Sequence, residues 1–332
     1  MKTLKWLLIS LLAVTVIYFA GPSPSTPKYN KDIPVIPNDV ESFISQKEAI
    51  HLLKKNNEAR IVWADDSIKA MTEYSIVYLH GFSASQEEGN PVHRNVAAHF
   101  GCNLYLSRLA EHGIDTTDQL INLTSDNYWE SAKEALFIGK KLGKKVILMG
   151  TSTGGTQALQ LAATYPNDVD AIILYSPNIE INDPNAYLLN NPWGLQIARL
   201  VKGGKLNYPA DTRPIYSEYW NRPYRLEALV NLEEMLETTM TKETFSKITQ
   251  PALMLYYYED EEHQDKVVRV EAMKKMFAAL STPKNMKMEM AVPNASNHVI
   301  GSPIMSKDVV TVENETIRFL NEKVALKSKQ KY

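Results

Sequence analysis

The segment KKVILMGTSTGGTQAL, residues 144–159, joins a short apolar run to a serine that stands between glycines. Residues 144–150 predict a strand buried on both faces, and residues 153–165 predict a helix. The pentapeptide around Ser152 fits G-x-S-x-G, a sharp strand-to-helix turn in which larger side chains would collide. The segment therefore predicts that Ser152 is a nucleophile. The alternatives are a plain turn and a phosphate-binding loop, and no lysine of a phosphate-binding loop follows the glycines.

Strand and helix patterns alternate on both sides of this segment. The alternation predicts an α/β fold in which helices cover both faces of a mostly parallel sheet. The predicted strands are residues 60–64, 74–82, 102–109, 144–150, 170–178, 251–258 and 284–292, and the predicted helices are residues 127–143, 153–165, 266–280 and about 307–325.

Residues 179–247 interrupt this alternation with helical patterns, irregular aromatic segments and no clear strand. An insertion after about the sixth strand would lie over the carboxyl edge of the sheet, where ligands bind in open α/β folds. The insertion is therefore a candidate lid. Its aromatic side chains could line a pocket for an acyl chain or an aromatic ester, or could pack into a small core of the lid itself. They are Tyr187, Trp193, Tyr208, Tyr216, Tyr219, Trp220 and Tyr224.

A serine nucleophile needs a base late in the chain and an acid between the two. His298 follows the last predicted strand in a loop of Asn, Ser and Gly, whereas His263 lies in the charged stretch EDEEHQD. We therefore expect His298 to be the base. Asp265 is the favoured acid because it directly precedes the predicted helix and would be its N-cap. Asp260, nearer the strand end, is the alternative.

Two backbone N–H groups must stabilise the oxyanion that forms in acyl transfer. The residue after the nucleophile, Thr153, supplies one donor. The loop after the strand in IVYLHGFSAS supplies the other, and we expect it to be the N–H of Phe82. His80 in the same loop is predicted to be structural.

The N-terminus predicts a targeting segment. Lys2 and Lys5 precede an apolar run that ends in a Pro/Ser-rich stretch. Residues 1–21 are predicted to be a signal-anchor or signal peptide, residues 22–45 a linker, and residues 46–326 the folded domain. An uncleaved anchor would hold the domain on the outer, periplasmic side of a membrane. Cleavage would instead release a secreted protein.

Composition excludes some classes of function. The chain has 36 basic and 38 acidic residues, giving a net charge of −2, so it lacks the basic excess of a nucleic-acid binder. Its one cysteine, Cys102, cannot form an internal disulfide bond. No metal-ligand spacing is present, and acyl transfer to water needs no cofactor. We therefore expect neither a metal nor a cofactor.

Together, the pieces HGF, GTSTGG, DKVV and NHV, in the order Ser, Asp, His, resemble the α/β-hydrolase superfamily over about residues 60–325. The resemblance is to serine aminopeptidase S33-like and monoacylglycerol-lipase-like hydrolases and small carboxylesterases. It implies an α/β-hydrolase fold with a helical lid, with Ser152 as nucleophile, Asp265 as acid and His298 as base. It also implies Phe82 and Thr153 as oxyanion donors. This sequence departs from the commoner pattern in its elbow, which reads Thr-Ser-Thr, and in its long acidic loop.

The sequence therefore predicts a serine hydrolase that cleaves small-molecule carboxylic esters through an acyl-enzyme. A peptidase or amidase with the same triad is the first alternative, because both reactions use the same nucleophile and oxyanion donors. A catalytically inactive binding protein with this fold is the second.

Overall fold

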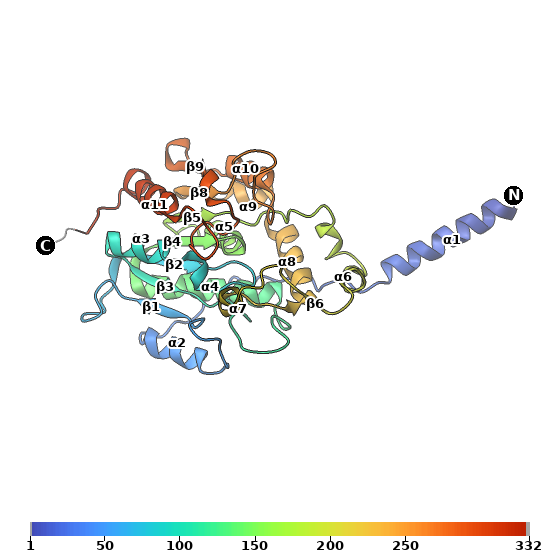
Figure 1. Ribbon diagram of the computed structural model, residues 1–332, viewed down its shortest axis with the longest axis horizontal. Helices are drawn as coiled ribbons and strands as arrows, with labels where there is room; N and C mark the ends of the chain where they lie inside the picture. Colours follow the sequence, from blue (N-terminus) through green and yellow to red (C-terminus); the bar gives the residue numbers. More distant parts are fainter. Residues whose placement is uncertain (1, 330–332) are drawn as a thin grey trace.

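The computed structural model describes residues 2–329, which form one α/β domain with a helix projecting from it (Figure 1). The central sheet has seven strands in the order β1-β3-β2-β4-β5-β8-β9, and only β1 runs antiparallel to its neighbour. The strands are β1 (Arg60–Val62), β2 (Thr72–Leu79), β3 (Asn103–Leu106), β4 (Gly143–Thr151), β5 (Ala171–Tyr175), β8 (Ala252–Tyr256) and β9 (Lys287–Ala291). The predicted mostly parallel sheet is confirmed.

Helices cover both faces of the sheet. The α-helices are α1 (Lys2–Phe19), α2 (Val40–Glu48), α3 (Val92–Phe100), α4 (Ser125–Leu142), α5 (Thr153–Thr164), α6 (Gly194–Lys202), α7 (Pro214–Tyr219), α8 (Leu226–Thr239), α9 (Lys242–Ser246), α10 (Val270–Ala279) and α11 (Val309–Lys323). Four short 3₁₀ turns are η1 (Gln86–Gly89), η2 (Ala186–Leu188), η3 (Lys284–Met286) and η4 (Pro293–Ala295).

The core has two layers because side chains alternate across each strand. Val146 and Leu148 of β4 face one cluster with α4, α5, α8 and α10, whereas Ile147 and Met149 face the other with α3 and α11. These four side chains are fully buried, which explains why the strand reads as a continuous apolar run. This two-sided burial holds the carboxyl end of β4, and with it the following turn, in a fixed place.

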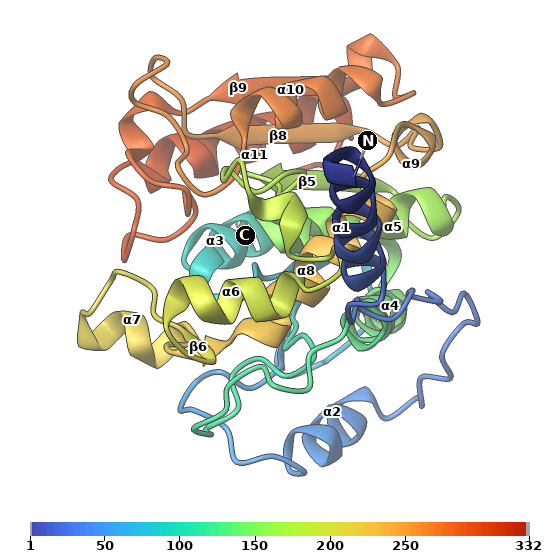
Figure 2. The same cartoon turned by 90° about the vertical axis from the view of Figure 1, so that its right-hand side faces the viewer.

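The insertion at residues 179–247 differs from its prediction in two ways. It contains two short strands, β6 (Leu206–Asn207) and β7 (Tyr224–Arg225), which pair antiparallel with each other. These strands have two residues each, too few to leave a periodic pattern. The insertion also follows the fifth strand of the sheet, not the sixth. Figure 2 shows α6, α7, α8 and β6 together at the end of the molecule from which α1 projects.

The predicted linker at residues 22–45 contacts the domain at several points, although most of its residues are exposed. The first turns of α2 lie inside this range, and Val40 and Ile44 are buried in the core with Ile36. Val40 and Ile44 are four residues apart in α2 and so lie on one face of that helix. The backbone carbonyl of Asn30 also accepts hydrogen bonds from Trp129 Nε1 and Lys133 Nζ.

The helix α1 extends away from the domain, and its apolar side chains are exposed (Figure 1). Among residues 2–329, no helix has both the length and the apolar character needed to span a bilayer, so the membrane-spanning part of the prediction for residues 1–21 is not supported.

Candidate functional site

The turn between β4 and α5 has the geometry expected of a strained elbow. Ser152 has φ 53° and ψ −121°, a backbone conformation that non-glycine residues rarely adopt. Hydrogen bonds on both sides hold it there, because its N–H donates to Tyr175 O at 2.8 Å and its carbonyl accepts from the N–H of Asn178 at 2.9 Å. The neighbouring strand β5 thus fixes the position of the serine.

Two glycines of the elbow are required by close backbone approach. A Cβ atom on Gly154 would lie 1.9 Å from the carbonyl oxygen of Leu79, and one on Gly150 would lie 2.4 Å from the carbonyl carbon of Gly154. Neither position can accept a side chain without moving backbone. The two glycines therefore let α5 begin directly against the ends of β2 and β4, with Ser152 at the turn.

His298 and Asp265 form a buried ion-paired hydrogen bond. Nδ1 of His298 lies 2.6 Å from Oδ2 of Asp265, and the Asp265 side chain is fully buried. The other carboxylate oxygen, Oδ1, accepts from the N–H groups of Val267 and Val268. Burial lowers the pKa of His298, but the charge and hydrogen bond of Asp265, with the charge of Glu88, outweigh it and raise the pKa above its usual value.

The prediction that Asp265 is the N-cap of the following helix is wrong. The helix α10 begins at Val270 with Arg269 as its N-cap. Val268 instead pairs with Ile181 in an isolated antiparallel bridge, which keeps the chain extended after Asp265. The two backbone N–H bonds to Oδ1 still fix the carboxylate. Asp265 is therefore held in one orientation, as an N-cap residue would have been.

The alternative acid, Asp260, lies apart from His298. Its carboxylate accepts from the backbone and the ring of His263, with Nδ1 3.0 Å from Oδ1. Both side chains are more than half exposed. Asp260 and His263 therefore pair with each other on the surface.

The loop after β2 carries one predicted oxyanion donor, Phe82, and the other, Thr153, is the first residue of α5. Within residues 2–329, no hydrogen bond engages the backbone N–H of Phe82 or Thr153. Buried histidines support this loop. His80 accepts at Nε2 from the N–H of Leu109, and His112 accepts at Nε2 from the N–H of Ser83, so both rings are neutral. Burial lowers the pKa of His80 to about 4, as expected for a structural histidine.

Glu88 is a residue at the site that the sequence did not reveal. It lies in η1, its side chain is 2% exposed, and Oε2 accepts from the N–H of Gly81 at 2.6 Å. Burial raises its pKa to about 7, although the Gly81 N–H and the charge of His298 lower it. In QEEG it stands beside a second glutamate, and nothing in that pattern separates a buried acid from a solvated one.

A cavity of about 460 Å³ connects these groups. Phe82, Ser152, Thr153 and His298 line it, together with Glu88. The lid supplies much of the remaining wall. Of the lid aromatics, Tyr216, Trp220 and Tyr224 line the cavity, whereas Tyr187 and Tyr208 are exposed and Trp193 binds the segment at Ile17 and Pro22.

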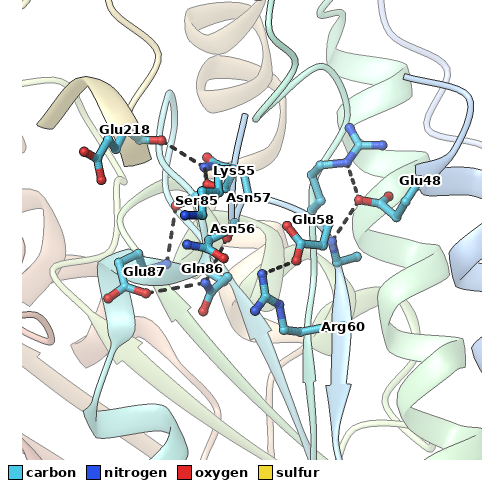
Figure 3. A network of polar contacts seen from close by, with 12 residues as sticks. Glu48, Lys55, Asn56, Asn57, Glu58, Arg60, Ser85, Gln86, Glu87 and Glu218 are labelled. Carbon is cyan, nitrogen blue, oxygen red and sulfur yellow. Dashed lines mark hydrogen bonds and ion pairs between the residues drawn. The ribbon is translucent and has the colours of Figure 1, made fainter. Parts of the chain in front are cut away.

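A polar network ties the lid to the loop that holds Glu88 (Figure 3). Nδ2 of Asn57 donates to the carbonyl of Glu218 at the end of α7, at 2.9 Å. Nε2 of Gln86 in η1 donates to the carbonyl of Asn56 at 3.3 Å. The loop at residues 55–58 therefore bridges η1 and α7, which fixes one lid wall relative to the site.

The part of the chain that the structure describes has no group of three or more His, Cys, Asp or Glu side chains able to hold a metal ion. Cys102 is a free, buried cysteine.

Comparison with known proteins relates part of this sequence, and its fold, to hydrolases. The model of the serine aminopeptidase S33 family matches residues 132–294, which include Ser152 and Asp265 and end just before His298. The chain has the α/β-hydrolase fold. No curated protein sequence matches it.

Solved structures share this fold at low sequence identity. A metagenome-derived lipolytic enzyme of the LipS and LipT pair aligns with a TM-score of 0.63 at 15% identity, covering 81% of this chain and 99% of its own. The monoacylglycerol lipase of Paleococcus ferrophilus gives 0.58 at 14% identity, covering 79% and 97%. The monoglyceride lipase of Saccharomyces cerevisiae, as a soluble variant, gives 0.54 at 14% identity, covering 82% and 92%.

Proposed function

We propose that this protein is a serine hydrolase that cleaves carboxylic esters through an acyl-enzyme on Ser152. The observation that carries the proposal is the buried pair of Asp265 and His298 on the wall of the cavity in which the strained Ser152 also lies. Phe82 and Thr153 line the same cavity, and their backbone N–H groups have no hydrogen-bond partner among residues 2–329. Nucleophile, base, orienting acid and anion donors are the parts that acyl transfer requires.

In the proposed reaction, Nε2 of His298 takes the proton of Ser152 as Oγ attacks the ester carbonyl. Asp265 holds Nδ1–H of the same ring, which keeps Nε2 available as the base and stabilises the imidazolium. The oxyanion binds the N–H groups of Phe82 and Thr153. His298 then gives its proton to the departing alcohol. Water attacks the acyl-enzyme by the same steps and releases the acid.

Esters are favoured over amides as substrates by the character of the cavity and by the related structures. Tyr216, Trp220 and Tyr224 give the cavity an aromatic wall suited to an acyl chain or an aromatic group. The similar structures include a lipolytic enzyme and two monoacylglycerol or monoglyceride lipases. An amidase or peptidase would use the same groups, so a matched pair of ester and amide substrates separates the two reactions.

A fluorophosphonate probe tests the nucleophile directly. We expect labelling at Ser152 by mass spectrometry, with loss of labelling and of ester turnover in Ser152→Ala and His298→Ala. Ser296→Gly is the matched control, because Ser296 also lines the cavity and its φ of 54° suits glycine. Labelling that persists in Ser152→Ala with folded protein would refute the proposal.

We further propose that residues 1–21 direct the chain to export. The basic residues Lys2 and Lys5 before the apolar run, and the exposure of that run away from the domain, support a role outside the fold. Fractionation of cells expressing the full chain tests it. We expect the domain outside the cytoplasm, either retained at a membrane or released. Cytoplasmic protein with an intact N-terminus would refute it.

A further inference from the structure

The carboxyl group of Glu88 is buried at the edge of the cavity. Within residues 2–329, the Gly81 N–H engages Oε2, no hydrogen bond engages Oε1, and no ion pair reaches either oxygen. A buried carboxylate is costly unless it is paired or fully hydrogen-bonded. Because Glu88 lines the cavity, a group bound there can supply the missing partner.

Glu88 lies between the oxyanion loop and the loop of His298. The point at which a Cβ of Gly81 would stand is 2.9 Å from Oε1 of Glu88 and 3.0 Å from Cβ of Ser152. On the other side, a Cβ on Gly301 would be 3.5 Å from the carbonyl oxygen of Glu88. His298 must pass its proton to the departing oxygen, so the alcohol part of the substrate lies on this side of the cavity.

Among the described residues that line the cavity, His298 acts on the charge of Glu88 only when protonated, and it must be neutral to act as the base. Phe82, Tyr216 and Trp220 form an aromatic wall. Lys266 also lines the cavity, but it is exposed and its Nζ donates to the carbonyl of Glu262 at 2.6 Å. In such surroundings an ammonium group would form a charge-assisted hydrogen bond with the Glu88 carboxylate. Water would compete poorly for that bond.

We propose that Glu88 is a specificity-determining residue that binds a primary ammonium group on the alcohol part of the ester, an inference that rests on the serine-hydrolase function proposed above. A hydroxyl group could donate one hydrogen bond to Oε1 but would leave the buried charge unpaired. An ammonium group satisfies both requirements. Glu88 takes no part in bond making or breaking.

The charge of Glu88 gives this contact a pH dependence. Burial raises the pKa of Glu88 to about 7, so the carboxylate forms as the pH rises through that value. The titratable groups that face it are Tyr78 of β2, Tyr128 of α4, Tyr216 of α7 and His298. Burial raises the pKa of all three tyrosines far above neutrality, so they stay uncharged. His298 titrates, but it serves as base for every ester alike.

The ratio of kcat/KM for a charged and a neutral ester therefore isolates the contribution of Glu88 to binding. The butyrates of 3-(aminomethyl)phenol and 3-ethylphenol have nearly the same shape and differ in the ammonium group. In the unmodified enzyme, kcat/KM should favour the ammonium ester by about tenfold or more at pH 8, the size of a charged hydrogen bond, and less at pH 5.5. Glu88→Gln keeps an oxygen that can accept from the Gly81 N–H, and it removes a charge that helps to raise the pKa of His298, so turnover of the two esters should change by a common factor apart from the ammonium contact. It should lose both the preference and its pH dependence.

Glu87→Gln is the matched control. Glu87 neighbours Glu88 in η1, and its side chain accepts from Nε2 of Gln86 (Figure 3). It also accepts from Nδ2 of Asn90 and does not line the cavity. This variant should keep the ratio and its pH dependence. Comparison with Glu88→Gln also removes the intrinsic difference in reactivity between the two phenyl esters.

The outcomes separate the two proposals. Turnover of the neutral ester that disappears in Ser152→Ala reports on the hydrolase function, whereas the ratio reports on Glu88. An unchanged ratio in folded Glu88→Gln would overturn the specificity role. If that variant does not fold, the specificity role is tested by inhibition of the unmodified enzyme with small alcohols and amines. Benzylammonium should compete with the neutral ester better than benzyl alcohol at pH 8 but not at pH 5.5, and equal inhibition at both pH values would overturn the role.

Discussion

Asp265 is held by more than its bond to His298. One carboxylate oxygen accepts two backbone N–H groups, so the other is aimed at Nδ1 of the ring with little freedom. The His298 side chain is itself 9% exposed, and the pair is therefore shielded from competing water. A carboxylate in this arrangement fixes both the tautomer and the orientation of the imidazole.

Asp265→Asn should reduce kcat by about 10³- to 10⁴-fold, because an amide can donate to Nδ1 and so place the proton on the wrong nitrogen. Asp260→Asn should leave kcat within about twofold, since Asp260 is exposed and pairs with His263. Steady-state hydrolysis of a neutral phenyl ester measures both. A larger loss in Asp260→Asn would assign the acid to Asp260.

The pKa of His298 predicts the acid limb of the pH–rate profile. His298 acts as a base only when neutral, and its pKa is raised above the usual 6.5 by Asp265 despite burial. The kcat/KM for a neutral ester should therefore rise with pH through a midpoint above 6.5. In Asp265→Asn the midpoint should move to lower pH, because burial then dominates. A midpoint that does not move would show that another group controls this limb.

At the scale of single residues, the sequence could predict what local patterns determine. Ser152 lies in a motif that needs its strand and helix beside it, and His298 follows the last strand in a polar loop. The choice between Asp260 and Asp265 stayed open, because both lie in one loop and the fold of that loop decides which one reaches His298. Glu88 carries no local signal, since its burial depends on contacts of η1 with loops distant in the sequence.

At the scale of elements, α8 carries an unfavourable charge. Glu233 is 4% exposed, and its Oε2 is buried without a hydrogen-bond partner among the described residues. Burial, together with the charges of Glu237, Glu180 and Asp183, raises the pKa of Glu233 to about 7. The folded protein thus binds a proton that the unfolded chain releases at lower pH.

Glu233→Gln should stabilise the protein at pH 8 by about 2 kcal/mol and have little effect near pH 4. The sign follows from the raised pKa, because stability is lost as the pH rises from the unfolded value through the folded one. Thermal unfolding at the two pH values measures the difference. Glu237→Gln removes only one of the neighbouring charges that raise this pKa, so it should give a smaller shift of the same sign at pH 8. Equal shifts at both pH values would show that packing, not charge, causes the effect.

Element boundaries were predictable where burial leaves a long periodic pattern, as in α4, whose buried residues recur along the whole helix. The start of α10 was not predictable. The bridge between Ile181 and Val268 keeps the preceding residues extended, and without it these residues would join the helix. The two-residue strands β6 and β7 depend on pairing across the lid. Tertiary contacts decided each of these cases.

At the scale of the whole molecule, the N-terminal segment has two parts that differ in how they contact the domain. The part before about residue 26 contacts the lid at Trp193 and is otherwise largely exposed. Residues 28–36 instead follow the surface of α4 and α5. The N–H of Tyr29 donates to Asp126, and the carbonyl of Lys31 accepts from Tyr165.

Two deletions should therefore have different effects on stability. Removal of residues 1–26 should leave the midpoint of urea unfolding nearly unchanged, because it takes no side chain from the core. Removal of residues 1–37 should cost about 3–5 kcal/mol, since it exposes the site of Ile36 and leaves Trp129 Nε1 and the buried ammonium of Lys133 without the carbonyl of Asn30. If the longer deletion does not yield soluble protein, Tyr165→Phe tests the same contact by removing its bond to Lys31, and should cost about 1 kcal/mol. Equal stability of the two deleted proteins would show that residues 28–36 lie on the domain without holding it together.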